Sequence, residues 1–127
     1  MPVPSFFSRT ATYAPFVLRA SLSLVILWFG VQQVIAPDMW VSWVPVWAYA
    51  FGISPETLVL TNGSFEVLAG VLLLAGISTR IVAFVLFLHM TLLVREFGAT
   101  PVGVRDFGLA MGLLTLALDD RSKWSLF

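Results

Sequence analysis

The sequence contains no cysteine and only one histidine among its 127 residues. The absence of cysteine excludes disulfides, cysteine-ligated zinc, iron–sulfur clusters and thiol catalysis, and a single histidine argues against a metal site built from histidines. Charge is also scarce, because charged residues make up 11 % of the chain and about 25 % of a typical soluble domain. The seven basic residues balance seven acidic ones, so the chain offers no electrostatic surface for nucleic acid.

Apolar side chains are abundant and make up 59 % of the sequence. A soluble domain of this size needs far more polar cover, and a disordered chain has fewer apolar residues. The length fits one domain. We therefore expect residues 1–127 to form a single all-α integral membrane domain.

Four apolar segments are candidates for membrane crossing, since a bilayer core needs roughly 20 apolar residues in a helix. Pro15 opens the first segment and Pro37 closes it, and Arg19 within it argues against a cleaved secretory signal. The sequence therefore predicts a four-transmembrane-helix bundle, with helices at about residues 15–36, 58–77, 79–96 and 102–118.

The segment between the first two predicted helices is rich in tryptophan and contains no basic residue. Trp40, Trp43 and Trp47 recur at helical spacing, and Pro45 among them predicts two short helical pieces. Tryptophan is enriched where the bilayer meets water. We expect an interfacial loop that covers one end of the bundle.

Basic residues near the predicted helix ends indicate the orientation of the chain. One side has Arg9, Arg80, Arg121 and Lys123, and the other side has Arg95 and Arg105. The positive-inside rule then predicts that both termini are cytoplasmic, in the plasma membrane of a prokaryote.

Small residues accompany the polar ones on the predicted helix faces. Gly30 shares a face with Gln33, and Gly63 shares one with Glu66. Gly108 and Gly112 form a GxxxG pattern, which suits close helix packing either within the chain or in a homo-oligomer.

Several ionisable or amide side chains lie within the predicted spans, where a charge costs about 2.5–3.5 kcal/mol on insertion scales. Arg19 sits apart, toward the cytoplasmic end. The others share the outer half of the bundle, and we expect them to form one polar cluster beneath the tryptophan loop: Gln33, Asn62, Glu66, His89, Arg105 and Asp106. Glu66 is expected to pair with Arg105 or with His89, and Asp106 with whichever of these two Glu66 does not take.

Three interpretations of this cluster stay open. It fixes helix register by pairing, it orients the head group of a small ligand such as a quinone, or it conducts protons or ions. One acid and one histidine at mid-depth make a poor relay, which argues against the third interpretation. Nothing in the pattern predicts a metal.

Short motifs in order along the chain resemble the DoxX-like family. They are Leu27-Trp-Phe-Gly-Val-Gln-Gln33 with Pro37 and Trp40, then Asn62-Gly-Ser-Phe-Glu66 with Gly70, then Gly76-Ile-Ser-Thr-Arg80, His89-Met90 and Val104-Arg-Asp-Phe-Gly-Leu109. The resemblance covers residues 16–118 and implies a four-helix membrane bundle. A relative, DoxD, is a subunit of an archaeal thiosulfate:quinone oxidoreductase, which implies a role close to quinones.

Our expectation is a protein that is not an enzyme on its own and that binds a quinone, a lipid or a partner subunit through the polar cluster. The chain has no haem-ligand pair or dinucleotide loop, so redox chemistry would need a borrowed cofactor or a partner chain. The alternatives are a membrane subunit of a quinone-linked oxidoreductase, and a structural scaffold whose charges serve packing alone.

Overall fold

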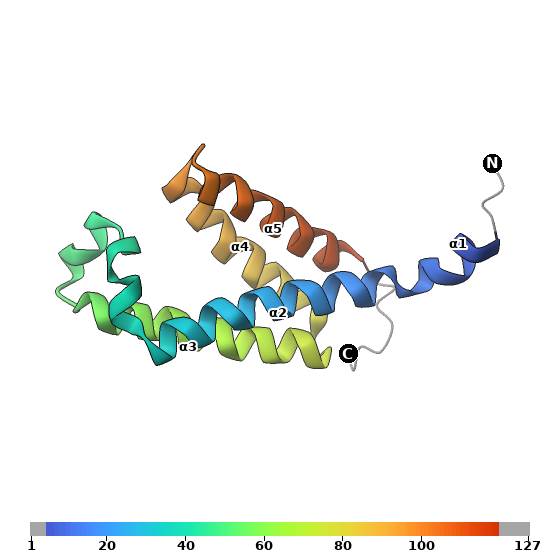
Figure 1. Ribbon diagram of the computed structural model, residues 1–127, viewed down its shortest axis with the longest axis horizontal. Coiled ribbons are helices and arrows are strands. Elements are labelled where there is room, and N and C mark those ends of the chain that lie inside the picture. Colours follow the sequence, from blue (N-terminus) through green and yellow to red (C-terminus); the bar gives the residue numbers. More distant parts are fainter. Residues whose placement is uncertain (1–4, 120–127) are drawn as a thin grey trace. The chain divides into compact units, whose positions relative to one another are not determined.

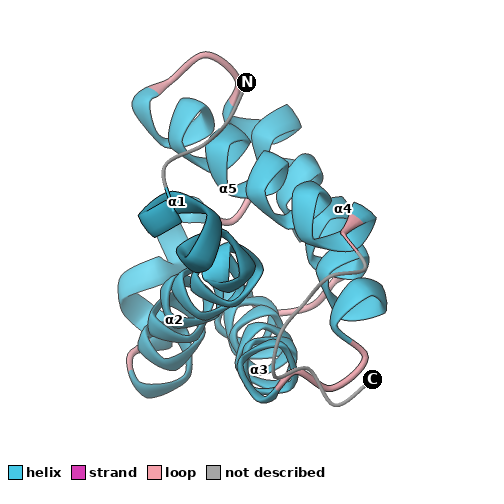
Figure 2. Ribbon diagram, turned by 90° about the vertical axis from the view of Figure 1, so that its right-hand side faces the viewer, coloured by secondary structure: helices cyan, strands magenta, loops and turns pink. Residues whose placement is uncertain are grey.

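The computed structural model describes residues 5–119, and this part of the chain is helical without any strand (Figures 1 and 2). A short α1 (Ser5–Thr10) and the 3-10 turn η1 (Ala11–Tyr13) lead into the long helices. The remaining elements are α2 (Ala14–Ile35), η2 (Pro37–Trp43), η3 (Val46–Phe51), α3 (Pro55–Ala75), α4 (Thr79–Phe97) and α5 (Pro101–Leu118). The predicted all-α class is confirmed.

Proline and glycine set the ends of the long helices. α3 begins at Pro55, three residues before the predicted start, because proline is preorganised for a first helical turn. It ends before Gly76, whose φ of 77° leaves the helical region. α5 begins at Pro101, and the hydroxyl of Thr100 caps it by accepting from the Gly103 amide at 3.1 Å.

Three helical stretches of the described chain are long and apolar enough to cross a membrane: Phe7–Ile35, Pro55–Ala75 and Pro101–Leu118. The fourth predicted span, α4, has enough length but carries three charged residues in its terminal turns, Arg80, Arg95 and Glu96. Arg121 and Lys123, which contribute to the predicted orientation, lie outside the described residues.

The chain divides into two compact units. The first consists of Met1–Leu22 with Leu72–Phe127, and the second of Ser23–Val71. In the first unit α4 and α5 lie side by side and run in opposite directions (Figure 1). Leu86 and Leu113 are fully buried there, and the guanidinium Nε of Arg80 donates to the Ala117 carbonyl at 2.9 Å.

The second unit contains the tryptophan-rich segment between α2 and α3. It forms two 3-10 helices, η2 and η3, which are separated by extended backbone at Val44 and Pro45, as the proline predicts. Trp43 and Trp47 are 47 % and 61 % exposed. The segment therefore presents aromatic rings on its surface.

Candidate functional site

Glycines bring α2 and α3 together within the second unit. A Cβ added at Gly63 would lie 2.7 Å from the Cβ of Gln33 and 2.9 Å from the Gly30 carbonyl oxygen. One added at Gly70 would lie 2.8 Å from a side-chain carbon of Leu27. Any larger residue at Gly63 or Gly70 must displace its neighbours, so the close approach depends on the missing side chains. The partners run in opposite order along the two helices, which are antiparallel.

Three polar side chains meet where the glycines let the helices approach. The Gln33 amide Nε2 donates to Oε2 of Glu66 at 2.9 Å. The Asn62 amide Nδ2 donates to Oε1 of Glu66 at 3.1 Å and to Oε1 of Gln33 at 2.8 Å. We call Gln33, Asn62 and Glu66 the amide–carboxylate cluster. The three side chains form a closed ring of hydrogen bonds.

The orientation of both amide groups follows from their neighbours. Gln33 Nε2 also donates to the backbone carbonyl of Phe29 at 3.1 Å. A carbonyl and a carboxylate can only accept hydrogen bonds, so the nitrogen of Gln33, and not its oxygen, must face them. The same argument fixes Asn62, whose nitrogen lies between a carboxylate oxygen and the carbonyl oxygen of Gln33.

Burial makes this cluster energetically important. Gln33 and Glu66 are 7 % and 6 % exposed, and Glu66 lies within an apolar helix suited to crossing a membrane. A charged group at mid-membrane costs about 2.5–3.5 kcal/mol, whereas each hydrogen bond to a charged group contributes about 1.5–3 kcal/mol. The two amide donors therefore supply stabilisation of the size that the carboxylate requires.

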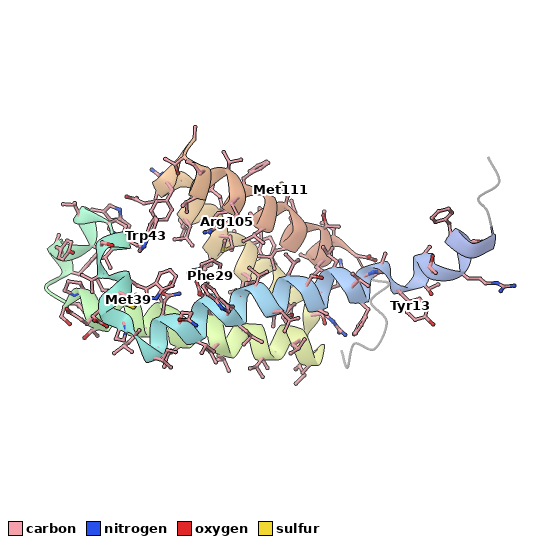
Figure 3. All side chains as sticks on the ribbon, in the orientation of Figure 1. Tyr13, Phe29, Met39, Trp43, Arg105 and Met111 are labelled. Carbon is pink, nitrogen blue, oxygen red and sulfur yellow. The ribbon has the colours of Figure 1, made fainter. Side chains whose placement is uncertain are left out.

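The other predicted site residues lie in the first unit. Arg105 on α5 (Figure 3) donates from Nε and Nη2 to Oδ1 of Asp106 at 3.2 and 3.1 Å. The Arg105 side chain is 50 % exposed and that of Asp106 only 4 %. His89 is half-buried on α4. Arg105 thus meets Asp106, one of its two predicted partners. The predicted pairs of Glu66 with Arg105 or with His89 would join the two units and stay predictions.

Phe29 and Arg19 make contacts that the sequence analysis did not identify. Phe29 offers its backbone carbonyl to Gln33, and its ring lies edge-on to that of Trp40 with centroids 5.8 Å apart. The second contact links the aromatic segment to the helix that carries Gln33. Arg19 is 2 % exposed, and its guanidinium carbon lies 5.5 Å from the centroid of the Phe16 ring. The helical spacing of Phe16 and Arg19 was the available signal for that contact.

Comparison with known families identifies the chain. The family model DoxX matches residues 14–99, which is most of the sequence. The chain belongs to the DoxX family. The matched region of this DoxX protein contains all three residues of the amide–carboxylate cluster and His89, whereas Arg105 and Asp106 follow it. No curated protein and no solved structure matches the chain significantly. Family and apolar helices together show a multi-pass integral membrane protein.

Proposed function

We propose that α4 is the fourth transmembrane span. It has 19 residues, or about 28 Å at 1.5 Å per residue, close to the hydrocarbon thickness of roughly 30 Å. Its three charged residues lie in the first and last turns, where long side chains reach the interface. α4 also runs antiparallel beside α5, so a membrane that α5 crosses is crossed by α4 as well.

An even number of spans places both termini on one side, which the basic residues assign to the cytoplasm of a prokaryotic cell. The tryptophan-rich segment then lies at the opposite interface. Because the chain has no cysteine, single cysteines give unambiguous labels at Ser8→Cys, Ser42→Cys and Ser125→Cys. We expect a membrane-impermeant maleimide to label Ser42→Cys in intact cells and the other two only after permeabilisation. Labelling of positions 8 and 125 from opposite sides would show an odd number of spans.

We propose further that the amide–carboxylate cluster binds the head group of a small lipophilic molecule of the quinone class. The observation that carries this proposal is a buried carboxylate within a membrane span, held by two amide side chains. Intramembrane ionisable groups are costly and commonly functional. The Phe29 and Trp40 rings, which meet edge-on, add apolar aromatic surface within about one helical turn of Gln33, which suits a lipophilic ligand.

The test is mass spectrometry of an organic extract from the purified protein. Glu66→Gln removes the carboxylate, and Glu56→Gln is its matched control, because Glu56 is exposed in the first turn of the same helix. We expect a lipophilic molecule to co-purify with the wild-type protein and with Glu56→Gln, and to be depleted in Glu66→Gln. Equal amounts of the lipophilic molecule in both variants, each monodisperse on size exclusion, would contradict the proposal.

A further inference from the structure

Every amide hydrogen of the amide–carboxylate cluster is already engaged. An amide nitrogen carries two hydrogens. Gln33 directs its two to the Phe29 carbonyl and to Glu66, and Asn62 directs its two to Gln33 and to Glu66. The amide groups of the cluster therefore have no N–H left to offer to an incoming molecule.

The hydrogen-bonding groups that the two amides still offer are acceptors. Oδ1 of Asn62 takes no hydrogen bond within the described part of the chain, and the residue is only half-buried. The carbonyl oxygen of Gln33 accepts one hydrogen bond and retains a second lone pair. The orientation of both amides is fixed by acceptors on their nitrogen side, so neither can rotate to present a donor. An outward acceptor attracts an O–H or N–H and repels a carbonyl oxygen.

We infer that the cluster selects a lipophilic molecule whose head group donates hydrogen bonds, a hydroquinone and not the corresponding quinone. This inference rests on the binding role proposed above. A quinone ring carries carbonyl oxygens that only accept, whereas the reduced ring carries two hydroxyl donors. A site that pairs with a hydroxyl rejects an analogue without one, because its own polar atom is then left unpaired. We expect the preference to be about tenfold or more in affinity.

The experiment compares three compounds of nearly the same shape on the intact, detergent-purified chain under anaerobic conditions: decylhydroquinone, decylquinone, and the dimethyl ether of decylhydroquinone. Binding adds to the free energy of unfolding a term that grows with the logarithm of ligand concentration over Kd, and the melting temperature rises as a result. The reductant that keeps the hydroquinone reduced cannot alter protein thiols, since the chain has none. We expect decylhydroquinone alone to protect the protein at concentrations where the quinone and the ether have no effect.

A pair of variants in one turn of α3 locates the effect. Asn62→Ala removes the open acceptor. Thr61→Ala is the control, because the Thr61 hydroxyl only donates to the Thr57 carbonyl on the exposed side of the helix. Protection by decylhydroquinone should disappear in Asn62→Ala and persist in Thr61→Ala.

Equal protection by the quinone and the hydroquinone would overturn this inference and leave the proposed binding role standing. So would protection that Asn62→Ala does not diminish. Failure of all three compounds to protect would also overturn this inference, and if no lipophilic molecule co-purifies either, the proposed binding role fails with it.

Discussion

Replacing Glu66 by glutamine tests the amide–carboxylate cluster with a change of one atom and one charge. The two carboxylate oxygens each accept from an amide nitrogen, Gln33 at 2.9 Å and Asn62 at 3.1 Å. A glutamine has only one oxygen. Whichever way its amide group rotates, its own nitrogen faces the nitrogen of Gln33 or of Asn62, and two donors oppose each other.

The expected cost follows from that geometry. One hydrogen bond to a charged group is lost, and the remaining one becomes a weaker neutral bond; a buried donor left unsatisfied costs about 1–3 kcal/mol. Removing the charge also relieves its insertion cost of about 2.5–3.5 kcal/mol, but the unfolded helix in the micelle carries much of that cost too. We expect Glu66→Gln to lower the free energy of unfolding by about 2 kcal/mol.

The assay is titration of the purified protein from mild detergent into SDS, followed by tryptophan fluorescence. A second variant combines Gln33→Leu, Asn62→Leu and Glu66→Leu, which removes donors and acceptors together. Within the ring such replacement is closer to neutral than Glu66→Gln, because the three side chains lose their donors and their acceptors together. We therefore expect the triple-leucine variant to be more stable than Glu66→Gln. Wild-type stability of Glu66→Gln, or a triple-leucine variant weaker than it, would refute the reasoning.

Two further stability predictions follow from contacts elsewhere in the chain. Gly63→Ala should lower the free energy of unfolding by about 1–3 kcal/mol through overpacking. The control Gly108→Ala, whose Cβ would meet nothing within 4 Å, should leave that free energy unchanged or raise it. Equal SDS midpoints for the two variants would contradict the glycine contact between α2 and α3. Arg80→Gln should lower it by about 0.5–1 kcal/mol, since Arg80 is partly exposed and loses one bond to the Ala117 carbonyl. The control Arg9→Gln, whose side chain is exposed on α1, should leave the free energy of unfolding unchanged. Identical thermal midpoints for Arg80→Gln and Arg9→Gln would show that the Arg80 bond contributes nothing.

The helices could be predicted from the sequence because apolar runs, and the proline and glycine residues that end them, are local features. Pro55, Gly76 and Pro101 mark helix ends by backbone geometry alone. Composition could not decide whether α4 crosses the membrane, since terminal charges and His89 lower its apolarity while its length suffices.

The meeting of Asn62 and Glu66 was also predictable, because residues four apart share a helix face. Gln33 was expected near them because all three residues lie in the outer half of the predicted bundle. The hydrogen bonds that complete the ring were not predictable: they depend on the glycine contact that sets the spacing of α2 and α3, and on the Phe29 carbonyl that orients Gln33. A backbone carbonyl has no signature in the sequence, so charge alone directed attention to Arg105 and His89.

The most direct test of the central claim is the amount of lipophilic molecule extracted from the triple-leucine variant, compared with the wild-type protein at equal monodisperse concentration. If the amide–carboxylate cluster binds a head group, the variant elutes at the same volume and its extract is depleted by at least about tenfold, because the anchoring hydrogen bonds are gone. Wild-type occupancy in the folded variant would contradict the claim.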